Sequence, residues 1–130
     1  MSNPEAVTVG EGPFGVPSII VNGMPDFIAN LKETLNGFFY GHLPILEMTQ
    51  GEKVRWYLMS GTNFEIHAPH WHGNVVNWRG MNTDVAMLGT MDMGIAEMVP
   101  DNPGMWLFHC HIAGHFAAGM IGRYLVNPAP

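Results

Sequence analysis

The sequence predicts an all-β fold, an antiparallel sandwich or a Greek-key barrel, from three observations. Short runs rich in β-branched and aromatic residues recur along the chain, as in strands. Turn residues separate these runs, with 16 Gly and 10 Pro among 130 residues. In the run Lys53–Met59, Val54, Trp56 and Leu58 alternate with Arg55, Tyr57 and Met59, which is the period of two that marks a strand. Seven or so such strands are typical of two packed sheets.

The expected elements follow in chain order. Residues 1–18 carry no clear period and are expected to form an arm or an irregular first strand. Ser18–Asn22 is a short β-branched run, and Phe27–Leu35 is consistent with either a helical turn or a loop. The remaining strands are expected at Ile45–Met48, Lys53–Met59, Phe64–His67, Gly73–Trp78, Ile95–Val99, Met105–His111 and Met120–Val126.

The composition indicates one compact domain over residues 1–130. The chain is 47% apolar and 12% charged, which is typical of a globular protein. Its five basic residues are spread thinly at a net charge of −6, so a nucleic-acid partner is not expected. No apolar run approaches the ~18 residues of a membrane span. The start lacks the pattern of an export signal, which indicates either a cytosolic protein or one whose signal has been removed.

The histidines carry the main functional signal. Six of the seven lie in two clusters, HAPHWH at His67–His72 and HCHIAGH at His109–His115, and the second cluster encloses the only cysteine, Cys110. A lone cysteine is often an inert buried residue, and the isolated His42 is expected to be an ordinary surface or core side chain. Six imidazoles around one thiol would make a poor core, so the clusters indicate metal ligands.

Strand geometry sorts these ligands into two sites. Successive side chains on a strand point to opposite faces, so Cys110 points away from the side that His109 and His111 share. His70 and His72 also share a face, and the histidine three residues before His70 is expected on the other one. If the two segments are neighbouring strands, they form an inward set and an outward set: His67 and Cys110 inward, and His70, His72, His109 and His111 outward.

The inward set favours copper. The spacing C-x4-H-x4-M after Cys110 adds His115 and Met120, if the connecting loop folds back. Two imidazoles, a thiolate and a distant thioether form the trigonal, weakly axial donor set that suits copper in electron transfer. Zinc also accepts Cys and His, but it prefers short tetrahedral bonds and gives no reason for a methionine at this spacing.

The outward set exceeds what a simple electron carrier needs. Its four imidazoles suit either a single second metal or copper with open positions for dioxygen. Cys110 is covalently continuous with His109 and His111, so electrons from the inward set have a short through-bond route to the outward one.

HAPHWHG together with WLFHCHIAGHFAAGM resembles the copper-binding domain of the multicopper oxidases. The similarity is strongest to the second domain of small two-domain laccases, followed by ceruloplasmin-type domains. It runs from Asn36–Gly37 through GEKVRWYLM to MIGRYLV, about the C-terminal two thirds. The resemblance implies a cupredoxin-like Greek-key fold and a periplasmic or extracellular location. Together with the chain length, this predicts a single cupredoxin domain over residues 1–130, in which residues 1–18 are the expected arm.

The resemblance also implies two kinds of copper site. The type 1 copper ligands, which accept electrons from the reducing substrate, match His67, Cys110, His115 and Met120. Half of the type 2/type 3 trinuclear cluster, which reduces O2 to water, matches His70, His72, His109 and His111. In the family the other half comes from a different domain, as two further H-x-H pairs, and this chain has none. A second copy or a complementary cupredoxin domain must supply it, and the likeness of HWHG to the first-domain motif favours a homo-oligomer.

The leading interpretation is a laccase-like copper oxidoreductase that is active only when oligomeric or paired with a second domain. Its partners would be O2 and a reducing substrate: a phenol, a metal ion or an electron-donor protein. The alternatives are a mononuclear blue copper electron-transfer protein and a unit resembling copper nitrite reductase. Against the latter, nitrite-reducing members usually lack the second histidine of HCH, whereas His111 is present.

Two smaller signals complete the predictions. Asp92 lies where small laccases carry an acid near the trinuclear cluster, so it is a candidate proton relay; the simpler alternative is a solvated loop carboxylate. Four neighbouring methionines are expected to fill the core rather than bind Cu(I), namely Met87, Met91, Met93 and Met98.

Overall fold

The structure, a computed structural model, describes residues 7–11, 17–21, 24–25, 31–61 and 64–130. The chain divides into two compact units, Met1–Lys32 and Glu33–Pro130. In the first unit, β1 (Val7–Glu11), β2 (Pro17–Val21) and β3 (Met24–Pro25) form an antiparallel sheet in that order. The expected run at Ser18–Asn22 is therefore a strand, apart from its last residue, which lies outside the described residues.

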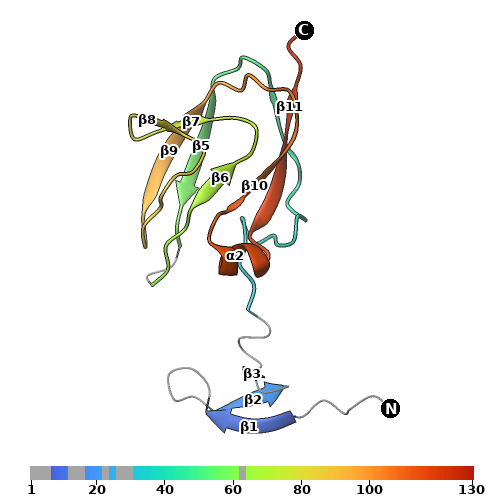
Figure 1. The fold of residues 1–130 in the computed structure, drawn as a ribbon, viewed down its shortest axis with the longest axis vertical. Helices are drawn as coiled ribbons and strands as arrows, with labels where there is room; N and C mark the ends of the chain where they lie inside the picture. The colour runs from blue at the N-terminus through green and yellow to red at the C-terminus, as the bar shows by residue number, and fades with distance from the viewer. Residues whose placement is uncertain (1–6, 12–16, 22–23, 26–30, 62–63) are drawn as a thin grey trace, which may run out of the picture. The chain divides into compact units, whose positions relative to one another are not determined.

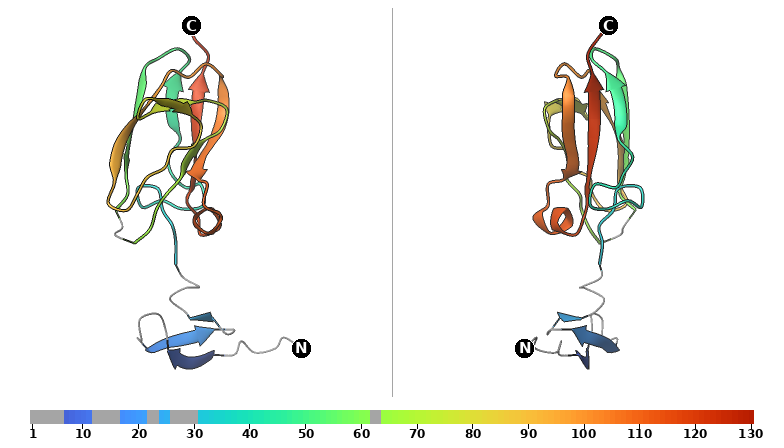
Figure 2. Two further views of the ribbon diagram at one scale, coloured as in Figure 1. Left: turned by 60° about the vertical axis from the view of Figure 1, so that its left-hand side comes forward. Right: turned by 90° about the vertical axis from the view of Figure 1, so that its right-hand side faces the viewer.

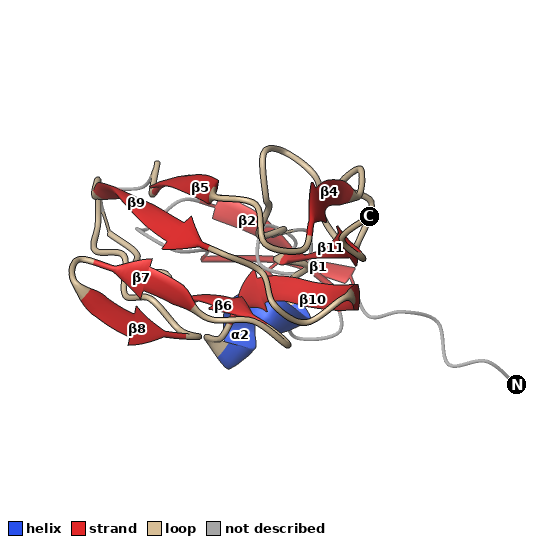
Figure 3. Cartoon of the chain, turned by 90° about the horizontal axis from the view of Figure 1, so that it is seen from above, coloured by secondary structure: helices blue, strands red, loops and turns tan. Residues whose placement is uncertain are grey.

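The second unit is a sandwich of two four-stranded sheets (Figure 1). One sheet has the order β4-β11-β10-β6 and the other the order β5-β9-β7-β8. All pairs are antiparallel except β4 with β11. Figures 2 and 3 show the two layers from the side and from above. The elements are β4 (Leu46–Thr49), β5 (Val54–Met59), β6 (Pro69–Trp71), β7 (Val76–Trp78), β8 (Met81–Thr83), β9 (Met93–Met98), β10 (Gly104–Cys110), α2 (Ala113–Ala117) and β11 (Ile121–Asn127).

The all-β prediction is confirmed, and an aromatic core between the sheets explains why the layers adhere. On β5, Trp56 is buried while Tyr57 is 75% exposed, as the alternation predicts. The Trp56 ring lies 4.9 Å from Phe108 and 5.7 Å from both Trp71 and Tyr124, centroid to centroid. Each of these large side chains removes 150–250 Å² of surface from water, worth about 25 cal/mol per Å².

Several sequence predictions need correction. Phe64–His67 is not a strand, since only an isolated bridge joins His67 to Leu88. The strand expected at Gly73–Trp78 begins at Val76, because Gly73 adopts a φ of +73° that a strand cannot accommodate. β8 was not predicted, because its sequence MNT carries no apolar alternation.

Two further differences lie near the functional region. A short helix, α2, occupies part of the loop expected after Cys110, where alanines favour helix. The strand β10 ends at Cys110, one residue before the expected end. Of the helical turn or loop expected at Phe27–Leu35, only residues 31–35 are described, and they form no helix. Across the described ranges, no helix is long and apolar enough to cross a membrane.

Candidate metal centre

The pairing of β6 with β10 brings the two histidine clusters together. These antiparallel neighbours place His109 opposite His70, and Cys110 opposite Pro69. The backbone of His111 continues the contact by donating its N–H to the carbonyl of Ala68 at 2.8 Å. Segments about forty residues apart in sequence therefore become adjacent strands, as the alternation argument required.

The inward set converges on one point. The Nδ1 atoms of His67 and His115 lie 3.2 Å apart, and Cys110 Sγ lies 3.6 Å from Nδ1 of His115. The ligand atoms of all three residues lie within 4.8 Å of one another. Met120 packs with Cys110 and Ala68 in a small buried cluster, so its side chain borders the set.

Local backbone bonds hold each member of this inward set. His67 exchanges two hydrogen bonds of 2.9 Å with the backbone of Leu88. The Cys110 N–H donates to the Met120 carbonyl at 3.1 Å, and the Met120 N–H donates to the His115 carbonyl at 3.0 Å. The Ala68 N–H donates to the sulfur of Cys110 at 3.4 Å. The loop through α2 thus folds back on the end of β10.

The surroundings of His67 favour its neutral imidazole. Burial lowers the pKa of His67, the nearby His115 lowers it further, and Glu65 partly opposes the shift. Neutral imidazole is the form that binds a metal. Two ring nitrogens and a sulfur, with a thioether at the border, match the donor set of an electron-transfer copper, and zinc leaves the thioether unexplained.

The outward set gathers on the other side of β10. Nε2 of His72 lies 3.0 Å from Nε2 of His109. Ligand atoms of His70, His72 and His109 lie within 4.8 Å of one another. The ring of His111 lies 5.0 Å from that of His70 and 5.8 Å from that of His109, at the exposed margin of the group.

Hydrogen bonds orient the outward rings. We assign Nδ1 of His109 as the donor to the Cys110 carbonyl at 2.8 Å, and Nδ1 of His70 as the donor to the Asp84 carbonyl at 3.0 Å. Each bond leaves Nε2 directed into the set, which is the usual arrangement of a metal-binding histidine. Burial lowers the pKa of His109 and of His72, and neighbouring imidazoles lower both further, while the bond to the Cys110 carbonyl partly opposes the shift at His109. The outward set therefore also fits a metal.

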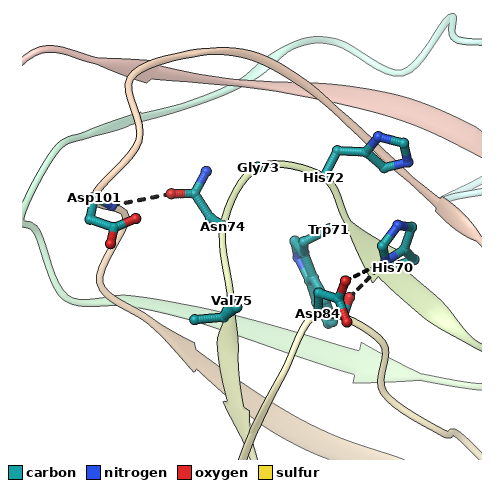
Figure 4. A pocket seen from close by; sticks show the side chains of 8 residues that line it. All are labelled: His70, Trp71, His72, Gly73, Asn74, Val75, Asp84 and Asp101. Atoms are coloured by element: carbon teal, nitrogen blue, oxygen red, sulfur yellow. Dashed lines mark hydrogen bonds and ion pairs between the residues drawn. The ribbon is translucent and has the colours of Figure 1, made fainter.

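Asp84 is the site residue that sequence reasoning missed. Its carboxylate lies 3.9 Å from Nδ1 of His70, and its carbonyl also accepts the N–H of Trp71 at 2.9 Å. Figure 4 shows Asp84 beside His70, and both residues line a surface pocket of about 370 Å³ together with His72. Asp84 reaches His70 through a tertiary contact, next to the bridge between His70 and Val85, so the spacing of the histidine motifs does not point to it.

Asp92, the predicted proton relay, has other neighbours. Its carboxylate accepts two bonds of 2.8 and 2.9 Å from Arg79 and further bonds from the N–H groups of Gly89 and Met93. The Gly89 N–H, the Arg79 guanidinium and the Met93 N–H lower the pKa of this carboxyl. The contacts described for Asp92 involve no histidine, and its relay role stays a prediction.

The remaining sequence-predicted residues have ordinary or unexpected positions. His42 is exposed and its Nδ1 lies 2.9 Å from the Phe39 carbonyl, apart from both sets. Of the four methionines expected in the core, Met98 is buried, but the other three are 55–68% exposed: Met87, Met91 and Met93. Met93 begins β9, where strand alternation directs its side chain to solvent, and Met87 and Met91 lie in the segment between β8 and β9.

A β-sandwich that carries a Cys/His/Met donor set and a four-histidine set back to back defines a class of copper-binding oxidoreductase domain. The family model described as Multicopper oxidase matches residues 20–130. The chain belongs to the multicopper oxidase family, and its fold is the cupredoxin-like sandwich of that family.

Three relatives illustrate the similarity. Ferroxidase HEPHL1 of Mus musculus is 38% identical over 100 residues, 76% of this chain and 9% of that protein. Ceruloplasmin of Homo sapiens is 37% identical over 102 residues, 75% of this chain and 10% of that protein. Hephaestin of Rattus norvegicus is 33% identical over 127 residues, 97% of this chain and 10% of that protein. The chain thus spans about a tenth of the length of these relatives.

Solved structures share the fold. A multicopper oxidase of Campylobacter jejuni, described as a metallo-oxidase, aligns with a TM-score of 0.61 at 22% identity, over 72% of this chain and 23% of that one. The blue copper oxidase of Nitrosomonas europaea aligns with a TM-score of 0.64 at 17% identity, over 90% of this chain and 37% of that one.

Proposed function

We propose that this chain is the copper-binding unit of a laccase-like multicopper oxidase that acts outside the cytoplasm. The observation that carries the proposal is the pair of donor sets on either side of Cys110. When bound, copper would supply one-electron transfer at the inward set and reduction of O2 to water at the outward set. The chain itself supplies ligands, orientation and a connecting backbone.

The proposed ligand roles follow from the geometry of each set. His67, Cys110 and His115, with Met120 at the border, would hold the type 1 copper. His70, His72, His109 and His111 would contribute half of the type 2/type 3 cluster. Because His109 and His111 are bonded directly to Cys110, the two metal sites would share a short covalent connection.

The proposed outward cluster needs a partner. One chain offers four imidazoles there, whereas the family's trinuclear cluster uses eight. The exposed position of His111 and the surface pocket beside His70 and His72 are consistent with a contact face. We propose that a second copy of this chain completes the cluster, with a complementary cupredoxin domain as the alternative.

We propose an oxidisable metal ion as the reducing substrate, with phenols and electron-donor proteins as alternatives. One ligand atom each of Glu33, Glu65 and His115 lies within 4.8 Å of the others, on the margin of the inward set. Burial raises the pKa of Glu33, and repulsion from Glu65 raises it further, so a cation between the two carboxylates would relieve an unfavourable pair. Among the relatives, HEPHL1 is named a ferroxidase. A ferrous ion there would give up one electron beside His115.

Copper content measured together with oligomer mass tests the oxidase proposal. A cluster of three coppers shared by two chains, with one type 1 copper each, predicts about 2.5 coppers per chain in an even-numbered oligomer. About one copper per chain in a monomer would instead favour the mononuclear electron carrier.

The variant His111→Ala separates the two sets. It should keep the blue absorption of the inward copper and abolish oxygen consumption, because it removes an outward ligand only. His42→Ala is the matched control and should change neither property, since that histidine lies apart from both sets. Undiminished oxygen consumption by His111→Ala would contradict the oxidase proposal.

A further inference from the structure

A buried hydrogen-bond network holds the backbone of His72. The Tyr124 hydroxyl donates to the His72 carbonyl, and Asn74 Nδ2 donates to the Tyr124 oxygen at 3.0 Å. Tyr124 is fully buried and Asn74 is 5% exposed.

The same network connects the turn at residues 72–74 to the 101–102 loop before β10. Asn74 Oδ1 accepts the N–H groups of Asp101 at 3.1 Å and Asn102 at 3.2 Å, and Figure 4 shows the bond between Asn74 and Asp101. In return, Asn102 Nδ2 donates to the Gly73 carbonyl at 3.1 Å. The turn is therefore fixed from β11 and from the 101–102 loop at once.

Steric packing leaves the turn little freedom. Gly73 has a φ of +73°, and a Cβ placed there would lie 2.3 Å from the indole of Trp106. That indole is itself held by a bond from its Nε1 to the Asn102 carbonyl at 2.9 Å. A turn fixed in this way fixes the direction in which the His72 side chain leaves the backbone.

We propose that Tyr124 and Asn74 are positioning residues, which hold the His72 backbone so that its imidazole meets that of His109 at the outward set. Neither side chain is among the metal ligands. The alternative is that the network only stabilises the fold, since removing one member of a buried network leaves its partners unpaired and destabilises the protein wherever the network lies. The proposal rests on the proposed function only for the consequence that it has for copper binding.

The test compares Tyr124→Phe with two controls. Val126→Ala, on the same strand and equally buried, lowers stability without touching the network. Tyr57→Phe removes an exposed hydroxyl elsewhere. In the metal-free protein, long-range 1H–15N spectra report the tautomer and contacts of each imidazole. We expect Tyr124→Phe to shift the His72 and His109 signals and to leave those of His67 and His115 unchanged, and we expect neither control to do so.

A second variant and a copper arm complete the experiment. Asn74→Asp keeps the acceptor for the 101–102 N–H groups but turns the donor to Tyr124 into a second acceptor, which competes with the His72 carbonyl for the Tyr124 hydroxyl, so it should shift the same signals. Unshifted His72 signals in Tyr124→Phe, or an equal shift in Val126→Ala, would overturn the positioning role. In a Cys110→Ser background, Tyr124→Phe should weaken Cu(II) binding by the outward histidines about 10- to 100-fold.

The spectra of the metal-free protein and the Cu(II)-binding measurement together distinguish failure of the positioning role from failure of the proposed function. If the His72 signals shift but the parent Cys110→Ser protein binds no Cu(II) at the outward set, the positioning role stands and the proposed function fails. If the parent protein binds Cu(II) and Tyr124→Phe binds it equally well, the positioning inference fails and the proposed function stands.

Discussion

The carboxylates of Asp84 and Asp92 have different partners. Asp92 is held by Arg79 and by backbone N–H groups, which lower the pKa of its carboxyl. Asp84 has its carboxylate beside His70, while its carbonyl fixes that ring. The partner of His70 is therefore Asp84, which the sequence motifs did not predict. Asp92, which was predicted as a proton relay, instead forms an ion pair with Arg79.

Glu33 and Glu65 should contribute to the binding of a ferrous ion. Replacing either by Gln should raise KM for ferrous ion about tenfold, a loss of about 1.4 kcal/mol of binding, because one charged ligand is removed. The kinetics with a phenolic donor should not change, since a phenol does not need these carboxylates. Glu47→Gln is the matched control, at an exposed carboxylate on β4. Equal losses with both donors would exclude a dedicated cation site.

The grouping of the candidate ligands into two sets could be predicted from the sequence because their spacing is local. Strand alternation separates Cys110 from His109, and C-x4-H-x4-M needs only a loop that folds back. The partners that orient the ligands could not be predicted, because Asp84, Asn74 and Tyr124 reach the site through tertiary contacts. Their sequence separations carry no periodic signal.

Among the elements, α2 joins the two donor sets. Its consecutive residues His115 and Phe116 serve different sides, since His115 belongs to the inward set and the Phe116 ring lies 4.9 Å from that of His109. Five residues are too few for a stable isolated helix. The helix is instead held at its ends by bonds such as that from the Glu33 N–H to the Ala118 carbonyl at 3.1 Å.

The packing of β9 on β7 gives a prediction at the element scale. A Cβ at Gly94 would lie 2.3 Å from the indole of Trp78, which is 4% exposed and cannot move aside. Gly94→Ala should therefore lower the free energy of unfolding by about 1–3 kcal/mol, measured by urea titration. Gly114→Ala is the control, because Gly114 lies in α2 with no atom within 4 Å of its Cβ position. It should raise the free energy by up to about 1 kcal/mol.

At the scale of the whole molecule, the two proposed copper sites depend differently on association. The inward set lies within one chain, since its ligand atoms come from His67, Cys110 and His115 of the same sandwich. The outward set has four histidines, and the proposed trinuclear cluster would take its other four ligands from a second chain. Dissociation of the oligomer should therefore abolish oxygen consumption at the outward set and leave the blue absorbance of the inward copper unchanged.

Dilution of the copper-loaded protein tests this difference. Oxygen consumption per chain should fall as the oligomer dissociates, in step with the mass measured by light scattering. The blue absorbance per chain should stay constant, because no inward ligand crosses the interface. Mixing His111→Ala with the native chain gives the internal check: mixed dimers should consume less oxygen than native dimers, because one face lacks a ligand. Constant specific activity down to monomer concentrations would show that the cluster does not depend on a second copy.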